Sequence, residues 1–311
     1  MSEIPIKIGT HIGSLVSFQG DLASLCLVSP SWLETSRPFL YRKLKINYGS
    51  STLKDTMLML NKNKLLKLNV KSLHLDGNGV PPTEEFTAEW NKNVNLDGME
   101  KIRSLYISGF HWTTSPDSFQ QNPMILQLLS QIRIPLLDEF KISIYTPISQ
   151  PVRPVTEFLA AHPSLRHFSI SSNDVLYFDE TSPKDILPNL ISLSTNYFVF
   201  IEMYGVFFSG NHLTSLEFNS ELPFHMEQKE RGMAEAGLLG KLVGQHPIKR
   251  LSHYKTWQKR ARLVARVLKN LGYVAPSIEH ISLLELHSLD NKADRVSSFA
   301  GNIKYIAYLI P

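Results

Sequence analysis

The stretch LRHFSI at residues 165–170 shows the pattern that decides the fold. Apolar residues stand at its first, fourth and sixth positions, and the same spacing recurs as VKSLHL at 70–75, IRSLYI at 102–107 and LDEFKI at 137–142. Successive side chains of a strand point to opposite faces, so the fourth and sixth positions are expected to face inward together. Full or partial copies continue the series, with their fourth positions at Leu193, Leu216, Leu251, Ile281 and Ile306.

The spacing of these copies indicates a repeat. Their fourth positions are separated by 23 residues (193 to 216) at the shortest and by 35 (105 to 140) at the longest. Segments with helical patterns lie between several copies, and a strand followed by a returning helix stacks into a solenoid. The predicted helices cover residues 53–66, 122–132, 154–162, 227–245 and 257–273.

The repeated pattern resembles a degenerate leucine-rich repeat, whose period is about 20–29 residues. Asn78 and Asn173 stand where that family closes its turn with asparagine. The predicted fold class is therefore α/β, with an irregular leucine-rich-repeat solenoid over residues 47–311. The alternative is an ordinary α/β domain with unrelated strands at these positions.

A different pattern occupies residues 1–46, where apolar residues recur at helical spacing in three short groups. Helices this short are marginal alone, so they have to pack on one another and on a partner. Asp21 is expected to cap the second helix, and Pro30 and Pro38 to mark helix boundaries. The groups are Ile4, Ile8, Ile12 and Leu15; Leu22, Leu25, Cys26 and Val28; and Trp32, Leu33, Phe39, Leu40 and Tyr41.

The order Ile-Pro, Asp-Leu-x-x-Leu-x-x-Val, Trp and Leu-Tyr-Arg in this segment resembles an F-box. That family is the module that docks a substrate receptor onto the Skp subunit of a cullin ubiquitin ligase. The resemblance implies packing of the helices by Trp32, Leu40 and Tyr41. It implies adaptor contacts from Ile4, Pro5, Ile8, Ile12, Leu22, Leu25 and Val28.

The first half of the segment departs from the F-box pattern. Ile4 replaces the usual leucine before Pro5, and Lys7 replaces the usual glutamate. Gly9 and Gly13 lie inside the first helix, where each costs about 1 kcal/mol relative to alanine. The alternative for this segment is a three-helix cap on the first repeat.

Composition favours a folded binding protein. The chain of 311 residues has 43% hydrophobic and 19% charged residues and a net charge of +4, which does not by itself indicate nucleic acid. The single cysteine, Cys26, excludes an intramolecular disulfide and is expected to pack in the core. No catalytic, phosphate-binding or zinc-protease motif is present, and the scattered histidines recur with the repeat. We therefore expect no cofactor and no metal.

The resemblance implies a non-catalytic substrate-recognition subunit of an SCF-type E3 ubiquitin ligase. Its partners would be a Skp-type adaptor, through it a cullin, and an unidentified target protein. The alternative is a leucine-rich-repeat scaffold that binds protein without a link to ubiquitin. The residues show no export signal and no apolar run long enough to span a bilayer, so an intracellular protein without membrane or nucleic-acid partners is expected.

The strand pattern also predicts a target-binding face. Residues that alternate with the inward leucines must face outward, His74 among them. Tyrosine and arginine are enriched at the energetic centres of interfaces, which favours the tyrosines and arginine of this set. The candidates are Tyr106, Lys141, His167, Glu217, Arg250, Tyr254 and His280.

Residues 249–269 contain eight lysines and arginines and no acid. One interpretation is a solvated helix with a basic outer face. The other is a patch that attracts an acidic or phosphorylated segment of a target, because clustered arginines pair well with such groups.

Overall fold

The computed structural model describes fifteen stretches of the chain, and all statements below concern them. They are residues 6–16, 18–47, 52–77, 96, 98–109, 128–130, 132–144, 153–172, 185–196, 199–200, 203, 213–218, 248–253, 280–284 and 305–309. The chain divides into two compact units. Unit 1 comprises Met1–His111 and Ile132–Leu137, and unit 2 comprises Trp112–Gln131 and Asp138–Pro311.

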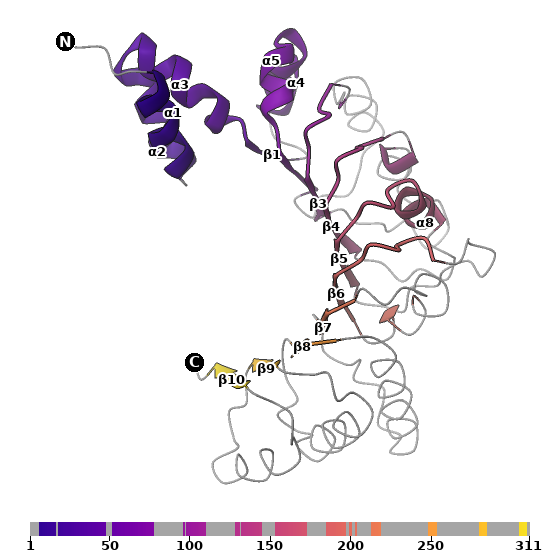
Figure 1. Cartoon of the computed structure of the whole chain (residues 1–311). Coiled ribbons are helices and arrows are strands. Elements are labelled where there is room, and N and C mark those ends of the chain that lie inside the picture. The colour runs from indigo at the N-terminus through magenta and orange to yellow at the C-terminus, as the bar shows by residue number, and fades with distance from the viewer. Residues whose placement is uncertain are drawn as a thin grey trace, which may run out of the picture. The chain divides into compact units, whose positions relative to one another are not determined.

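Unit 1 begins with three short helices and continues with parallel strands (Figure 1). The helices α1 and α2 both pack on α3. Two further helices separate the first two strands. The elements are α1 (Ile6–Leu15), α2 (Gln19–Val28), α3 (Pro30–Leu40), β1 (Lys43–Asn47), α4 (Thr52–Lys62), α5 (Lys64–Asn69), β2 (Ser72–Asp76) and β3 (Ser104–Ser108).

Local sequence explains most boundaries of the three helices, with two corrections. Pro30 is the first residue of α3, as predicted, and the Ser29 hydroxyl accepts a hydrogen bond from the backbone N–H of Trp32. Asp21 is not the N-cap of α2, because that helix begins at Gln19. The carboxylate of Asp21 lies in the first turn, where its negative charge interacts favourably with the helix dipole. Pro38 does not end α3 and lies within its last turn.

The strands of unit 1 align their repeated apolar positions. The pairs β1–β2 and β2–β3 are parallel and place Leu44, Leu73 and Leu105 in one register. Leu73, Leu75 and Leu105 are fully buried, so the predicted inward face is confirmed here. β1 is not predicted by the sequence analysis and begins inside the segment assigned there to the helices.

Unit 2 continues the same architecture with seven parallel strands that each pair with the next (Figure 1). Their register aligns the fourth positions of the repeat from Phe140 through Leu216 to Ile306. The strands are β4 (Glu139–Ile144), β5 (His167–Ser172), β6 (Ser192–Thr195), β7 (Ser215–Phe218), β8 (Arg250–His253), β9 (His280–Leu284) and β10 (Tyr305–Leu309).

Aromatic rings fill the core of unit 2 next to its first strands. Phe140 stacks on Phe168 with ring centroids 5.7 Å apart, and Phe158 of helix α8 (Arg153–Ala160) lies 4.6 Å from Phe140. All three side chains are buried. Such large apolar side chains bury the most area and anchor α8 on the strands.

Asn196 closes the turn after β6. Its side-chain amide donates to the carbonyl of Ser172 at 3.0 Å, and its carboxamide oxygen accepts from the backbone N–H of Val199 at 2.8 Å. The residue is buried, so these bonds satisfy backbone groups that water cannot reach. Asn78 and Asn173, the predicted turn residues, lie outside the described residues.

The helix predictions meet different outcomes. The predicted helix 53–66 is two helices, because the side chain of Asn63 caps a new start at α5. The prediction 154–162 corresponds to α8. Of 122–132, only the helical residues 128–130 are described, and the predictions 227–245 and 257–273 lie outside the described residues.

Candidate protein-interaction surfaces

The first helix presents an unusual buried face, made of glycines. Gly9 and Gly13 are buried against α3, and a Cβ added at Gly9 would lie 2.8 Å from the Thr35 hydroxyl oxygen. A Cβ added at Gly13 would lie 3.0 Å from the Phe39 ring. The two glycines therefore let α1 approach α3 closely, which offsets the propensity cost expected of them.

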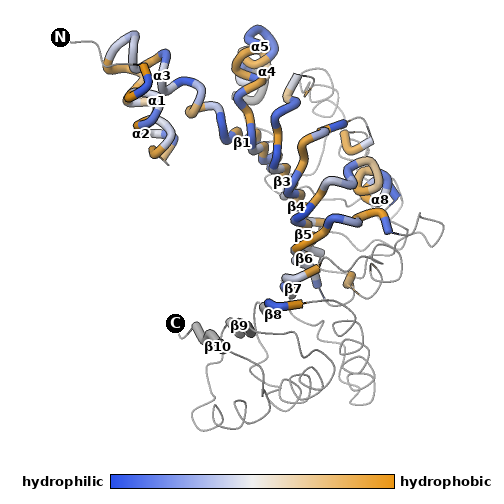
Figure 2. Tube along the Cα trace, in the orientation of Figure 1, coloured by the Kyte–Doolittle hydropathy of each residue, from blue (hydrophilic) through white to orange (hydrophobic). Residues whose placement is uncertain are grey.

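The consequence is that the isoleucines and leucine of α1 face solvent. Ile8, Ile12 and Leu15 follow one another at i, i+4 and i+7, and all three are exposed, Leu15 by 70%. Leu27 and Val28 at the end of α2 are also exposed, by 88% and 65%. Figure 2, which colours the trace by hydropathy, shows hydrophobic and hydrophilic residues interspersed along α1 and α2. Exposed apolar side chains that share one helix face, as those of α1 do, are typical of interaction sites.

The remaining residues implied by the F-box resemblance have other environments. Leu22 is buried within the helical segment, and Leu25 is half-buried. Trp32, Leu40 and Tyr41, the expected packing residues, are half-buried. Ile4 and Pro5 lie outside the described residues. Leu27 and Phe18, which is exposed by 74%, are apolar surface residues that the motif comparison misses.

Cys26 lies beside this surface and is half-buried, which is less than the core position expected of it. Burial raises the pKa of its thiol, and the nearby Arg37 guanidinium opposes that rise. A raised pKa leaves less thiolate at neutral pH and makes the sulfur less reactive.

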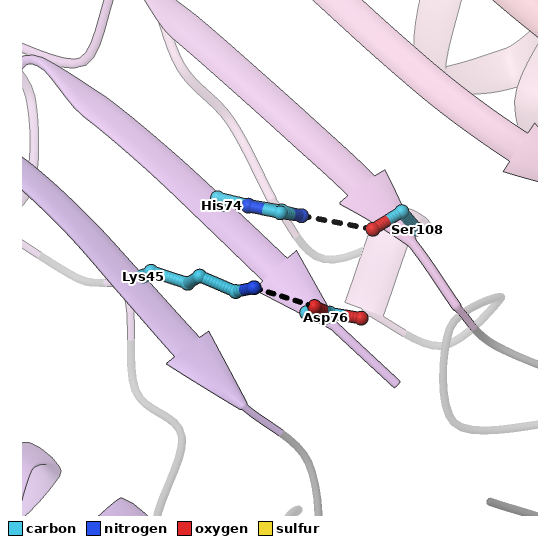
Figure 3. Close-up of polar contacts among 4 residues, drawn as sticks. All are labelled: Lys45, His74, Asp76 and Ser108. Atoms are coloured by element: carbon cyan, nitrogen blue, oxygen red, sulfur yellow. Dashed lines mark hydrogen bonds and ion pairs between the residues drawn. The ribbon is translucent and has the colours of Figure 1, made fainter. Parts of the chain in front are cut away.

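A second candidate surface is the outward face of strands β1–β3, which we call the open face of unit 1 (Figure 3). The register places Lys45, His74 and Tyr106 in one row and Asn47, Asp76 and Ser108 in the next. These residues alternate with the buried apolar residues of the strands. The register places His74 beside Tyr106, two residues that the repeat pattern predicts to face outward.

Contacts within the open face hold its side chains in place. The rings of His74 and Tyr106 stack with centroids 4.3 Å apart and planes 19° apart. Nε2 of His74 lies 2.8 Å from Oγ of Ser108, and Nζ of Lys45 lies 2.7 Å from Oδ2 of Asp76 (Figure 3). Lys45, Asp76 and Ser108 are not identified by the repeat pattern, and they become candidates because of their contacts in the structure.

The environment of His74 favours its neutral form. Burial of the ring lowers the pKa of His74 below 6.5, Lys45 lowers it further, and the carboxylate of Asp76 opposes both. Loss of hydration and a neighbouring cation both disfavour imidazolium.

The His74–Ser108 contact matches the distance of a nucleophile and its base, but distance alone does not make such a pair catalytic. Acyl transfer also needs donors aimed at a developing oxyanion and a group that orients the base. In the structure the His74 ring is stacked on Tyr106, and the nearby carboxylate of Asp76 is paired with Lys45. They describe a preorganised surface.

The outward face of unit 2 combines charged residues with serines. His167 and Arg250 belong to one row and Lys141 and Glu217 to the next, with serines at most positions between them. Nζ of Lys141 pairs with Oε1 of Glu139 at 2.7 Å. Lys141 and Arg250 are exposed, and His167 and Glu217 are half-buried.

Two predicted target-binding residues are described only in part or not at all. His280 lies on β9 in register with Arg250 and Tyr305. Tyr254 lies outside the described residues, as does most of the basic segment 249–269.

Metal-ligand clusters and membrane-spanning helices are both absent from the described stretches. They hold no group of three or more His, Cys, Asp or Glu residues that could bind a metal ion. None of their helices combines the length and the apolar character that spanning a bilayer requires.

No protein-family model and no curated protein sequence matches the chain. Among the solved structures similar to this chain are two bacterial proteins. The leucine-rich repeat-containing protein LegL7 from Legionella pneumophila has 12% identity and a TM-score of 0.46, covering 86% of this chain and 90% of its own. A Bacteroides fragilis protein has 12% identity and a TM-score of 0.40, covering 84% of this chain and 73% of its own. Neither similarity is close enough to assign a function.

Proposed function

We propose that this protein is the substrate-recognition subunit of an SCF-type ubiquitin ligase, itself non-catalytic. In this proposal α1–α3 bind a Skp-type adaptor, which links the chain to a cullin, and the outward faces of the strands bind a target protein. The adaptor role comes from the F-box resemblance of residues 1–46, and the target role from the repeated parallel strands.

The observation that carries the proposal is the arrangement of α1. A helix that served only to cap the first repeat would be expected to bury its large apolar side chains against the protein. Here α1 buries two glycines and leaves Ile8, Ile12 and Leu15 exposed. Exposing apolar area to water costs about 25 cal/mol per Å². Binding of a partner that covers this surface is therefore favoured by a similar free energy per unit area.

Target binding is supported by the rigidity of the open face of unit 1. Before any partner arrives, the His74 ring is stacked on Tyr106 and its Nε2 lies within hydrogen-bond distance of the Ser108 hydroxyl. A preorganised surface loses less conformational entropy on binding than a mobile one. Tyr106 is the first candidate for a contact of large energy, because tyrosine is enriched at such positions.

The test of adaptor binding replaces Ile8 and Ile12 by serine. Both side chains are exposed, so the double variant keeps the core intact and removes only apolar surface. We expect it to lose co-purification with a Skp-type adaptor, while the parent retains it. Circular dichroism and thermal unfolding confirm that the variant is folded.

The matched control replaces Leu58 and Leu65, two exposed leucines of α4 and α5, by serine. This variant loses similar apolar surface outside α1–α3 and should keep the adaptor. Equal adaptor binding by parent and Ile8→Ser/Ile12→Ser protein would contradict the proposal. If a target protein were still captured, that result would favour the alternative scaffold without a link to ubiquitin.

A further inference from the structure

Three basic residues stand at equivalent positions of three successive repeats in unit 1. Arg42, Lys71 and Arg103 each precede a strand by one residue, at one edge of β1, β2 and β3. The register that pairs Lys43 with Ser72 and Ser72 with Ser104 places them side by side. All three are exposed. We call them the basic row.

Backbone hydrogen bonds fix the spacing of the basic row. The N–H groups of Lys71 and Ser72 both donate to the carbonyl of Arg42, at 2.9 and 3.0 Å. The N–H groups of Arg103 and Ser104 both donate to the carbonyl of Lys71, at 2.8 and 3.1 Å. Neighbouring strands lie about 4.8 Å apart, so three cationic side chains leave the sheet within about 10 Å.

Within the described residues, none of these three cations has an ion-pair partner. Glu100 and Lys101 are adjacent residues of opposite charge in the turn before β3, so together they add no net charge beside the row. Like charges directly opposite one another in a sheet are destabilising. The arrangement therefore costs stability that an anionic partner would restore.

The corresponding positions of unit 2 show that the repeat does not require this charge pattern. The same pair of backbone bonds links Asp138, Arg166, Ile191, Thr214 and Lys249 in succession. There the arginine has an acidic neighbour, with Nε of Arg166 4.0 Å from Oδ1 of Asp138. The unbalanced row is thus a property of particular residues in unit 1 and not of the fold.

We propose that the basic row of unit 1 binds an acidic segment of a partner polypeptide. This rests on the proposed protein-binding role of the repeats and not on adaptor docking. Arginine and lysine bind carboxylates through charge-assisted hydrogen bonds, which are the stronger class. A polypeptide fits better than nucleic acid because the row is short and the net charge of the chain is only +4.

The test measures binding of a labelled peptide that contains a run of glutamates, with its glutamine counterpart as the uncharged probe. We expect the full-length protein to bind the glutamate peptide at low salt and to lose affinity as salt rises, because charges are screened over about 10 Å at 0.1 M. The double variant Lys71→Gln/Arg103→Gln should bind roughly tenfold more weakly, the loss expected for two exposed ion pairs.

The matched control is Lys62→Gln/Lys64→Gln, which removes two exposed lysines of α4 and α5 and the same net charge. It should bind the glutamate peptide as the parent does. Equal losses in the two double variants would show an effect of net charge and overturn the inference, as would equal binding of the glutamine peptide.

Single-stranded RNA and vesicles containing phosphatidylserine are tested as competing probes. The assignment to a polypeptide would be overturned if the protein bound RNA or vesicles more tightly than the glutamate peptide and the Lys71→Gln/Arg103→Gln variant lost that binding. Adaptor co-purification is measured on the same variants. Its absence from the parent would contradict the proposed ligase role and leave the peptide result unaffected.

Discussion

At the scale of single residues, glycine has opposite consequences at different positions of the helical segment. Gly9 packs against Thr35, which is buried and whose hydroxyl donates to the carbonyl of Ser31 at 3.0 Å. Thr35 is β-branched and held by this bond, so it cannot turn away from an added methyl group. At Gly20, in α2, an added Cβ would enter open space.

These surroundings predict opposite effects of the same substitution. Helix propensity alone favours alanine over glycine by about 1 kcal/mol at either position. At Gly9 we expect overpacking of about 2 kcal/mol to exceed that gain and to lower the free energy of unfolding by about 1 kcal/mol. Gly20→Ala should raise it by about 0.5–1 kcal/mol, because nothing opposes the gain in helix propensity there. Urea unfolding of the two single variants measures both, and a stabilised Gly9→Ala protein would rule out close packing of α1 on α3.

At the scale of elements, the strands are predictable from sequence where their pattern is complete. The spacing predicts strands at nine positions from Leu73 to Ile306, and each is present, because buried strand faces demand apolar residues two apart. β1 carries the same pattern with Tyr41 at its first position, which conceals it. The side of α1 that is buried could not be predicted, because periodicity identifies an apolar stripe and not which face another helix covers.

The open face of unit 1 depends on contacts between side chains, which the repeat pattern does not specify. The environment of His74 in this face leads to a prediction about how stability depends on pH. The lowered pKa of His74 means that the unfolded chain, with a value near 6.5, binds this proton more readily than the folded protein. Neutral His74 therefore contributes to the free energy of unfolding in full above pH 6.5. This contribution is lost as the pH falls below 6.5 and the unfolded chain takes up the proton. His74→Gln should reduce this part of the pH dependence.

Urea unfolding at a series of pH values measures how the free energy of unfolding changes with pH. NMR titration of the His74 ring measures its pKa directly. Lys45→Gln should raise the pKa of His74, since the ammonium group lowers it, and Asp76→Asn should lower it further. A ring that titrates above 6.5 in the parent would contradict the burial argument.

At the scale of the whole molecule, repeats that contact mainly their neighbours make stability local. In such chains a defect weakens its own repeat and those adjacent to it, because each interface joins only two units. Unit 2 offers a site for the test: Phe168 of β5 is buried and stacks on Phe140 of β4. On the other face of β5, Ser169 is half-buried and pairs in register with Lys141 and Ser194.

Phe168→Ala should cost about 3–5 kcal/mol at its site, from lost burial and the cavity left behind. We expect amide hydrogen exchange to accelerate most in β4, β5 and β6 and least in β1 and β2, because the loss is transmitted through neighbouring strands. Ser169→Ala, on the same strand, removes only a hydroxyl and should leave the exchange pattern close to that of the parent. Equal acceleration in β1 and β5 of the Phe168→Ala protein would mean that the whole chain unfolds as one cooperative unit. If the acceleration of exchange is confined to β4–β6, stability is local to each repeat. A partner bound at the open face of unit 1 would then stabilise that unit without stabilising unit 2.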